Sequence, residues 1–328
     1  MPYPSALTER PGSLSGTGFA VETGGFGVPA AATTFLPMMT NGMEYEPGWF
    51  SPTLMMGDRD KQVFNLQGEA KNIGSVEGPL FPSNAIPLLV AAIGTDAVTG
   101  SGPYTHTLSQ ANGLASLTVE KNIGGFQSLQ FAGCRVGKLS VKAPTGNEPV
   151  TMTADLSGQS VAILTSPTAI SVTNEIPWEF SEASLTLASN ARADVTNVTL
   201  DIDNGLKETW TYSGNHGPSF ITPVSLHVSG TVDVVWTSLN SGTYGDFTTM
   251  LNQTPGALSL AFTHPGMNGY SITFNCPQVV LSKYGNDLKF DDVVMSSFTF
   301  EASRPLTGGS QYTIQAAVVN GVSTQYTG

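Results

Sequence analysis

Apolar and polar residues alternate along many short segments of this chain. In the segment 150–157 the even positions hold Val, Met, Ala and Leu, and the odd positions hold Thr, Thr, Asp and Ser. The segments 198–203 and 231–236 follow the same period of two. Side chains on a β-strand point alternately to opposite faces, so this period predicts antiparallel strands with one face in a core and the other in solvent.

The composition is typical of a chain made of strands and turns. The 328 residues include 36 Gly and 21 Pro, and only 12% of them are charged. Helical bundles and coiled coils need more Glu, Lys and Leu, so the composition argues against them. The hydrophobic share of 40% can supply a sizeable core, and the net charge of −12 argues against tight binding of nucleic acid, which depends on Lys and Arg.

One segment is predicted to be a helix, SNAIPLLVAAIG at residues 83–94. Asn84 is placed to cap its start, Pro87 falls in its first turn and Gly94 can end it. The helical spacing is carried by Ile86, Leu89, Val90 and Ile93.

No segment predicts a membrane span or a secretion signal. The longest strongly apolar run, 85–93, is much shorter than the ~20 residues that a membrane-spanning helix needs. The first residues lack a basic stretch followed by an apolar one. Cys134 and Cys276 do not form a disulfide framework, so we expect two free buried thiols and a protein made in a reducing cytoplasm.

Short motifs recur in the same order in the two halves of the chain. The pairs are TNGM at 40–43 with DNGL at 203–206, GSVE at 74–77 with GTVD at 230–233, ASLTV at 115–119 with LSLAF at 258–262, and CRVGKLS at 134–140 with CPQVVLS at 276–282. A second short helix, predicted at 246–252 with Asp246 as its cap, follows GTVD as the first helix follows GSVE. This order predicts two copies of one unit.

The motif spacing makes the first copy longer between Asn41 and Gly74. We expect a long loop there, at about 42–65, that carries apolar side chains beside charged ones and contacts another subunit. Its predicted contact residues are Trp49, Phe50, Met55, Met56 and Arg59. The alternative is a hairpin tip that folds back on its own domain.

The sequence contains no arrangement that indicates catalysis. The four His residues lack the spacing of a zinc site, and DIDNG at 201–205 starts like a calcium loop but has Gly205 at a ligand position. No serine-nucleophile motif occurs, and the neighbouring Asp291 and Asp292 would point to opposite faces of a strand. We therefore expect no enzyme activity, no metal and no cofactor.

The phrase FAVETGGFGVPAAATTFLPM at 19–38 resembles the opening of tail tube proteins of long-tailed phages. The resemblance continues in the first half through GSVEGPLFPSNAIPLLVAAIG, GPYTHTLSQANGLASLTVEKNIGG and FAGCRVGKLSVKA, and in the second half through VTLDIDNGL and VSGTVDVVW. Together these motifs span about residues 18–303.

The resemblance implies an all-β fold of β-sandwich or split-barrel domains, each with one short flanking helix. The sheets of such domains join around a ring into one β-barrel, and rings stack into a tube that conducts DNA during ejection. The rings are usually six-fold, so a chain with two tube domains would form a homotrimeric pseudo-hexamer with long and short arms alternating. The expected parts are an N-terminal arm at 1–17, domains at 18–165 and 166–305, and a C-terminal strand or tail at 306–328.

The resemblance also implies partners and a location. The partners are further copies of the chain, a tape-measure protein and DNA inside the lumen, and tail terminator and distal tail proteins at the tube ends. We expect the protein to assemble in the bacterial cytoplasm and to reside in the virion. The duplication favours a flexible, non-contractile tail of the siphophage type.

A channel that passes DNA should repel phosphate weakly over its whole surface, and the acidic composition fits that role. Glu77 and Asp233 hold matching positions in the two copies, and we predict that they face the lumen together with Asp155 and Asp201. The alternative is that these acids lie on a solvated outer wall.

Two other classes of function stay open at this point. A virion decoration or adhesion protein would offer its β-domain loops to a receptor and would not polymerise. A glycan-active β-rich enzyme would need an aromatic groove with two carboxylates, and the chain has only 4 Trp residues.

Overall fold

The computed structural model describes residues 12–55, 57, 59–61, 64–173, 175–188, 190–237, 245–267, 269–287, 293–308 and 311–327. Met56 of the predicted contact loop, Asp291, Asp292 and most of the predicted N-terminal arm lie outside these residues. Nearly all regular structure in the described residues is antiparallel strand, with two α-helices and short 3₁₀ turns at Gly12–Leu14 and Phe180–Glu182. The predicted mainly β fold is therefore confirmed.

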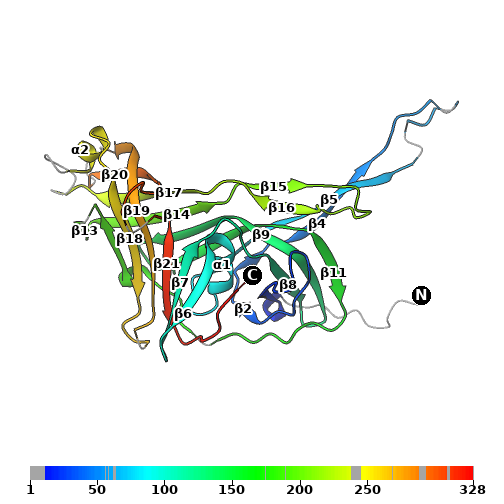
Figure 1. The fold of residues 1–328 in the computed structure, drawn as a ribbon, viewed down its shortest axis with the longest axis horizontal. Helices are drawn as coiled ribbons and strands as arrows, with labels where there is room; N and C mark the ends of the chain where they lie inside the picture. The colour runs from blue at the N-terminus through cyan, green and yellow to red at the C-terminus, as the bar shows by residue number, and fades with distance from the viewer. Residues whose placement is uncertain are drawn as a thin grey trace.

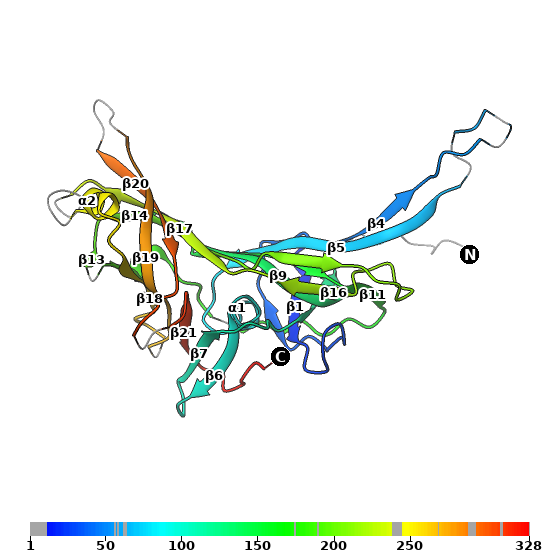
Figure 2. The same ribbon diagram turned by 45° about the horizontal axis from the view of Figure 1, so that its top comes forward.

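A central sheet crosses the molecule, and Figure 2 shows that it is curved, with α2 beyond one end and the β4–β5 hairpin at the other. Figure 1 shows α1 below this sheet. Its strands, in spatial order, are β3 (Thr40–Asn41) and β4 (Glu44–Phe50), β5 (Leu66–Pro79), β10 (Thr151–Gly158), β9 (Gln127–Pro144), β14 (Val195–Asp203), β17 (His227–Val235), β20 (Met295–Ala302) and β19 (Ser271–Asp287).

Two further sheets pack beside the central one. The first has the order β2 (Thr34–Leu36), β1 (Gly16–Val21), β8 (Leu117–Ile123), β9 and β11 (Ser160–Leu164). The second has the order β13 (Asn190–Arg192), β12 (Ala183–Leu187), β18 (Gly256–Thr263), β19, β21 (Gln315–Asn320), β7 (Tyr104–Gln110) and β6 (Gly94–Thr99). A separate ribbon pairs β15 (Leu206–Thr209) with β16 (Phe220–Pro223).

The strands β9 and β19 are each long enough to belong to two sheets. The first part of β9 pairs with β8 and β11, and its second part pairs with β10 and β14. In the same way β19 pairs first with β18 and β21 and then with β20. A β-bulge lies within each second part, at Gly137 and at Ser282, where bulges add twist and allow a strand to turn from one sheet into another.

The two halves of the chain repeat the same pattern of pairing. β10 lies between β5 and β9, and β20 lies between β17 and β19. The order β2–β1–β8–β9 has its counterpart in β13–β12–β18–β19. β11 pairs with the first part of β9, and β21 pairs with the first part of β19.

The predicted alternation corresponds to the observed burial. The even positions of 150–157 are buried against the core, while Thr151, Thr153 and Ser157 are half-buried and Asp155 is exposed on the other face. Along β14 and β17 the apolar positions are buried in the same way. Trp236 is an exception because β17 ends at Val235, and its side chain is partly exposed.

The predicted first helix is α1, Ile86–Ile93, shorter than the segment 83–94 at both ends. Asn84 is not its cap: Ala85 holds the N-cap position without a side-chain hydrogen bond, and Asn84 accepts a hydrogen bond from Thr173 instead. Gly94 ends the helix with a φ of 145°, which favours glycine. All residues of α1 are buried because β9, β6, β7, β1 and β21 surround it.

The second helix is α2, Asp246–Leu251, and its start also differs from the prediction. Gly245 is the N-cap, while Asp246 stands in the first turn and accepts a hydrogen bond from Arg192 at 2.7 Å. The Arg192 guanidinium also binds both carboxylate oxygens of Asp194, at 2.8 and 2.9 Å. Burial raises the pKa of Asp194, but the hydrogen bonds and charge of Arg192 outweigh it and hold that pKa below its usual range.

The register of the central sheet corrects the predicted difference in loop length. Asn41 pairs with Val76, and the residue that pairs with Val232 in the second half is Val198, so TNGM does not correspond to DNGL. When the two hairpins are compared between equivalent positions, the segment 47–70 of the first half is one residue longer than the segment 204–226 of the second half. Both are hairpins, and the segment predicted as a loop contains β4.

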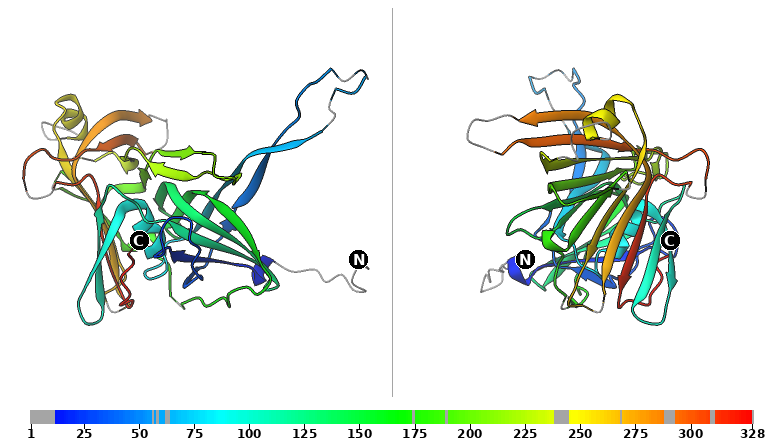
Figure 3. Two further views of the ribbon diagram at one scale, coloured as in Figure 1. Left: turned by 45° about the vertical axis from the view of Figure 1, so that its right-hand side comes forward. Right: turned by 90° about the vertical axis from the view of Figure 1, so that its left-hand side faces the viewer.

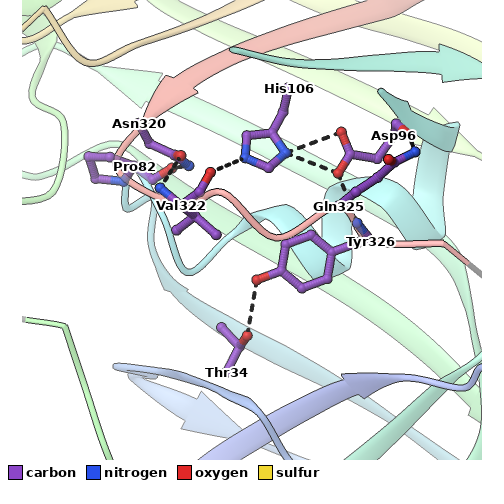
Figure 4. A network of polar contacts seen from close by, with 8 residues as sticks. All are labelled: Thr34, Pro82, Asp96, His106, Asn320, Val322, Gln325 and Tyr326. Atoms are coloured by element: carbon purple, nitrogen blue, oxygen red, sulfur yellow. Dashed lines mark hydrogen bonds and ion pairs between the residues drawn. The ribbon is translucent and has the colours of Figure 1, made fainter. Parts of the chain in front are cut away.

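The C-terminal tail is fastened by a buried network around His106 (Figure 4). The ring Nδ1 lies 2.9 Å from Asp96 Oδ2, and Nε2 lies 2.9 Å from the Val322 carbonyl oxygen. Gln325 donates to the Asp96 carbonyl oxygen, and the Tyr326 backbone N–H donates to the Asp96 carboxylate. Both ring nitrogens of His106 therefore face acceptors, which only the protonated ring can satisfy.

Replacing Arg192 by Ala should lower the free energy of unfolding by about 3–5 kcal/mol, because two buried carboxylates lose their cation. Urea denaturation of the unassembled protein measures this loss. The matched control is Arg304→Ala, an exposed arginine whose removal should change the free energy by less than about 0.5 kcal/mol. Equal losses of unfolding free energy in the two variants would contradict the role of Arg192 as the cation that neutralises Asp194 and Asp246.

The attachment of the tail should weaken as pH rises. Burial lowers the pKa of His106, but its hydrogen bonds to Asp96 and Val322 and the charge of Asp96 outweigh burial and raise that pKa above the ordinary value. The stabilisation is thus complete below the ordinary pKa of about 6.5 and is lost as pH passes the raised one. Amide hydrogen exchange of residues 321–327, corrected for intrinsic rates, should accelerate across this range. His106→Gln should exchange quickly at every pH, and protection that does not change with pH would refute the role of His106.

Candidate functional site: a polar sheet face and two hairpin arms

One face of the central sheet is polar from β5 to β20. Cross-strand partners in a sheet point to the same side, so the register identifies the residues that share this face. One continuous row runs through neighbouring strands in the order Glu77, Thr153, Ser140, Asp201, Ser229 and Glu301. The opposite face packs on the core, so these side chains lie on the side that no core residue covers.

The four acids predicted to face a lumen all lie on this polar face. Glu77 and Asp201 belong to the row above, Asp155 is opposite Lys138, and Asp233 is opposite Asn197 and Ser297. Asn197 Nδ2 donates to Asp233 at 3.0 Å. Asp201 accepts a hydrogen bond from Ser140 and lies 3.2 Å from the Lys138 ammonium group.

Other charged residues on the same face were not identified from the sequence. They include Asp203 and Glu301, with Lys71, Lys138, Lys142 and Lys283. The sequence signal that could have found them is their period-two spacing from the predicted acids, combined with the strand pairing that only the structure supplies. Most remaining positions are hydroxyl residues, and Thr199 and Thr231 share a hydrogen bond of 2.7 Å across two strands.

The first hairpin arm consists of β4, the start of β5 and their connection. Figure 3 shows it as the blue hairpin that stands clear of the body. Trp49 is 62% exposed, Phe50 is about half-exposed, and Met55 and Arg59 are exposed. The residues of β4 are exposed except Pro47, which is half-buried, so this strand pairs with β5 and packs on little else.

The second hairpin arm is the ribbon β15–β16 with its connection, and it lies along the first half of the chain. The His216 carbonyl accepts from Ala70 N–H, and its Nδ1 lies 2.9 Å from the Gly68 carbonyl oxygen. Ser157 donates to Glu208, and the Leu206 side chain lies over Gly137. The two arms thus have nearly equal lengths but different surroundings.

Within the described residues no cluster of His, Cys, Asp and Glu is suited to hold a metal ion. Cys134 and Cys276 are buried and unbridged, and burial raises the thiol pKa of both, that of Cys276 to about 12. Thiols held in this protonated state are poor nucleophiles. Among the described residues no helix combines the length and the apolar character that a membrane crossing needs. The arrangement offers surfaces for assembly.

Comparison with known proteins agrees with this arrangement. No curated protein shows a significant sequence match to the chain. The sequence model of a family described as phage tail tube protein matches residues 12–302, which include the central sheet, both arms and both helices. The chain therefore belongs to the phage tail tube protein family, and it is a structural virion protein that assembles with itself into the tail tube.

Proposed function

We propose that three copies of this chain form one ring of the tube, as a pseudo-hexamer, and that the ring surrounds the channel for DNA ejection. The observation that carries the proposal is the repeated strand pairing, in which two equivalent halves join their sheets through β9 and β14. On this basis residues 18–165 and 166–305 are two tube domains, preceded by the arm 1–17 and followed by the C-terminal strand and tail, 306–328.

The polar face of the central sheet is proposed to line the lumen. Its hydroxyl groups and carboxylates present hydrogen-bonding groups to water and no cluster of cations to phosphate, so DNA would meet weak repulsion and few adhesive contacts. Glu77, Asp155, Asp201 and Asp233 are the proposed lumen acids. The concave profile of the sheet in Figure 2 supports this orientation.

The first arm is proposed to contact another subunit through Trp49, Phe50, Met55, Met56 and Arg59. Exposed aromatic side chains on a projecting hairpin are typical of an interaction site. Inside the lumen the proposed partners are DNA and a tape-measure protein, and at the tube ends they are terminator and distal tail proteins. Assembly in the bacterial cytoplasm and a siphophage-type tail complete the proposal.

Electron microscopy of the purified protein, over a range of concentrations, tests the assembly. We expect hollow rings that stack into tubes, with three-fold symmetry and six similar lobes in end-on averages. Rings of six chains would leave the tube function intact but would contradict the pseudo-hexamer. Particles that lack a pore at every concentration would contradict the tube itself.

Reversing charge on the proposed lumen face should make the tube retain DNA. The double variant Asp155→Lys/Asp233→Lys should still form tubes, since both side chains lie on the solvent side of the sheet. Short duplex DNA should co-sediment with these tubes at low salt and be released as salt increases, whereas wild-type tubes should leave it in solution. The matched control is Glu148→Lys, an exposed acid in the turn between β9 and β10. Equal DNA retention by the control tubes would contradict the assignment of the lumen face.

A further inference from the structure

Along the residues that follow its bulge, β9 pairs with a strand on each of its two edges. The equivalent part of β19 pairs with a strand on one edge only among the described residues. β9 has β10 on one edge and β14 on the other along the residues that follow its bulge, Lys138–Pro144. β19 has β20 on one edge along the residues that follow its own bulge, Lys283–Asp287. The described residues supply no strand for the other edge of that part of β19.

The strand equivalent to β14 is the pair β3 and β4. Glu44, Tyr45 and Glu46 lie beside β5 as Asp201, Ile202 and Asp203 lie beside β17.

The outer edge of β4 likewise has no strand partner among the described residues. The exposure differs accordingly: the side chain of Ile202 is 1% exposed within its joint, and Tyr45 is 42% exposed. Unpaired strand edges are sites at which a second chain adds its own strand.

We propose that β19 of one subunit pairs with β3 and β4 of the next, in the register that β9 and β14 display within the chain. In that register Lys283 stands opposite Glu46, as Lys138 stands opposite Asp203, and Gly285 stands opposite Glu44, as Ser140 stands opposite Asp201. The inference rests on the proposed ring and adds the residues that close it.

We call the proposed contact of β19 with β3 and β4 of the next subunit the seam. The charges on its two sides are complementary. Within the chain, Lys138 Nζ lies 3.2 Å from Asp201. The seam would place Lys283 beside Glu44 and Glu46, so a cation again meets carboxylates.

The two helices show where the seam lies. α1 is completely buried at the β9–β14 joint, where Asn204 donates to the Ala92 and Val136 carbonyl oxygens. α2 packs on β19 in the equivalent place but leaves Phe247 and Leu251 exposed. In the proposed pairing, β3 and β4 of a second copy would lie beside β19 and α2 as β14 lies beside β9 and α1. They would cover part of the apolar surface of α2.

In this arrangement the two hairpin arms would contact equivalent positions, the bulge residues of β9 and β19. Leu206 follows Asp203 by three residues and lies over Gly137, the bulge residue of β9. Trp49 follows Glu46 by three residues, so in the seam it would lie over Ser282, the bulge residue of β19. Ser282 is exposed in the single chain, which leaves room for an indole ring.

Paired cysteines test the register. Residues directly opposite each other have Cβ atoms about 4.5–5.5 Å apart, within reach of a disulfide after slight adjustment. Glu44→Cys with Gly285→Cys should therefore give covalent dimers and trimers on a non-reducing gel of assembled protein, and the ladder should end at the trimer. A Cβ at Gly285 meets no atom within 4 Å, and Glu44 is exposed, so the folded chain accommodates both changes.

The matched control is Tyr45→Cys with Gly285→Cys. Neighbouring residues on a strand point to opposite faces, so this pair should not crosslink if the register is right. The native Cys134 and Cys276 are buried and should not contribute. Preferential crosslinking of the control pair would overturn the proposed register.

A charge exchange gives an independent measurement. Lys283→Glu alone and Glu46→Lys alone should each reduce the yield of rings several-fold, and the double exchange should restore most of it. If wild-type protein forms tubes but no seam pair crosslinks and the exchange rescues nothing, this seam is wrong and the tube function stands. If wild-type protein forms neither rings nor tubes, the proposed ring itself fails.

Discussion

The backbone ladder between β9 and β14 is the interaction on which the rest of this structure depends. It joins the central sheets of the two halves, so that one polar face extends across the six neighbouring strands β5, β10, β9, β14, β17 and β20. Backbone N–H and C=O groups must find partners, and a strand edge left open recruits another strand. The same requirement acts at the outer edges of β4 and β19, which have no strand partner among the described residues and which we propose to pair between subunits.

The helices follow from this constraint. A sheet that keeps one face polar must bury its other face against something, and each half uses a short helix with a flanking sheet for that purpose. α1 is wholly buried because the joint and the C-terminal strand enclose it, whereas α2 keeps exposed apolar residues. Two buried polar side chains attach outer segments to the body. Arg192 of β13 forms an ion pair with Asp246 of α2, and His106 of β7 contacts Asp96 of β6 and the Val322 carbonyl oxygen of the C-terminal tail.

Much of the fold could be predicted from the chain because period-two alternation reports directly on sheet faces. The buried positions of β10, β14 and β17 and the approximate position of α1 follow from local pattern alone. The caps could not be predicted, because Asn84 and Asp246 found tertiary partners that compete with the helix termini. The predicted difference in arm length was wrong because TNGM and DNGL look alike but occupy different registers, and register is set by cross-strand packing.

The sequence by itself determined the β-rich class, the two short helices, the acidic character of the chain and its resemblance to tail tube proteins. The first three depend on composition and on local patterns, and the resemblance depends on the order of short motifs along the chain. Only the tertiary structure decided that Glu77, Asp155, Asp201 and Asp233 share one face and that the second arm rests on the first half while the first arm stands free. It also decided which strand edges lack a partner in the part of the chain that the structure describes. The physical reason is that facing and pairing depend on contacts between residues far apart in the chain, and a local pattern cannot specify which strand lies beside which.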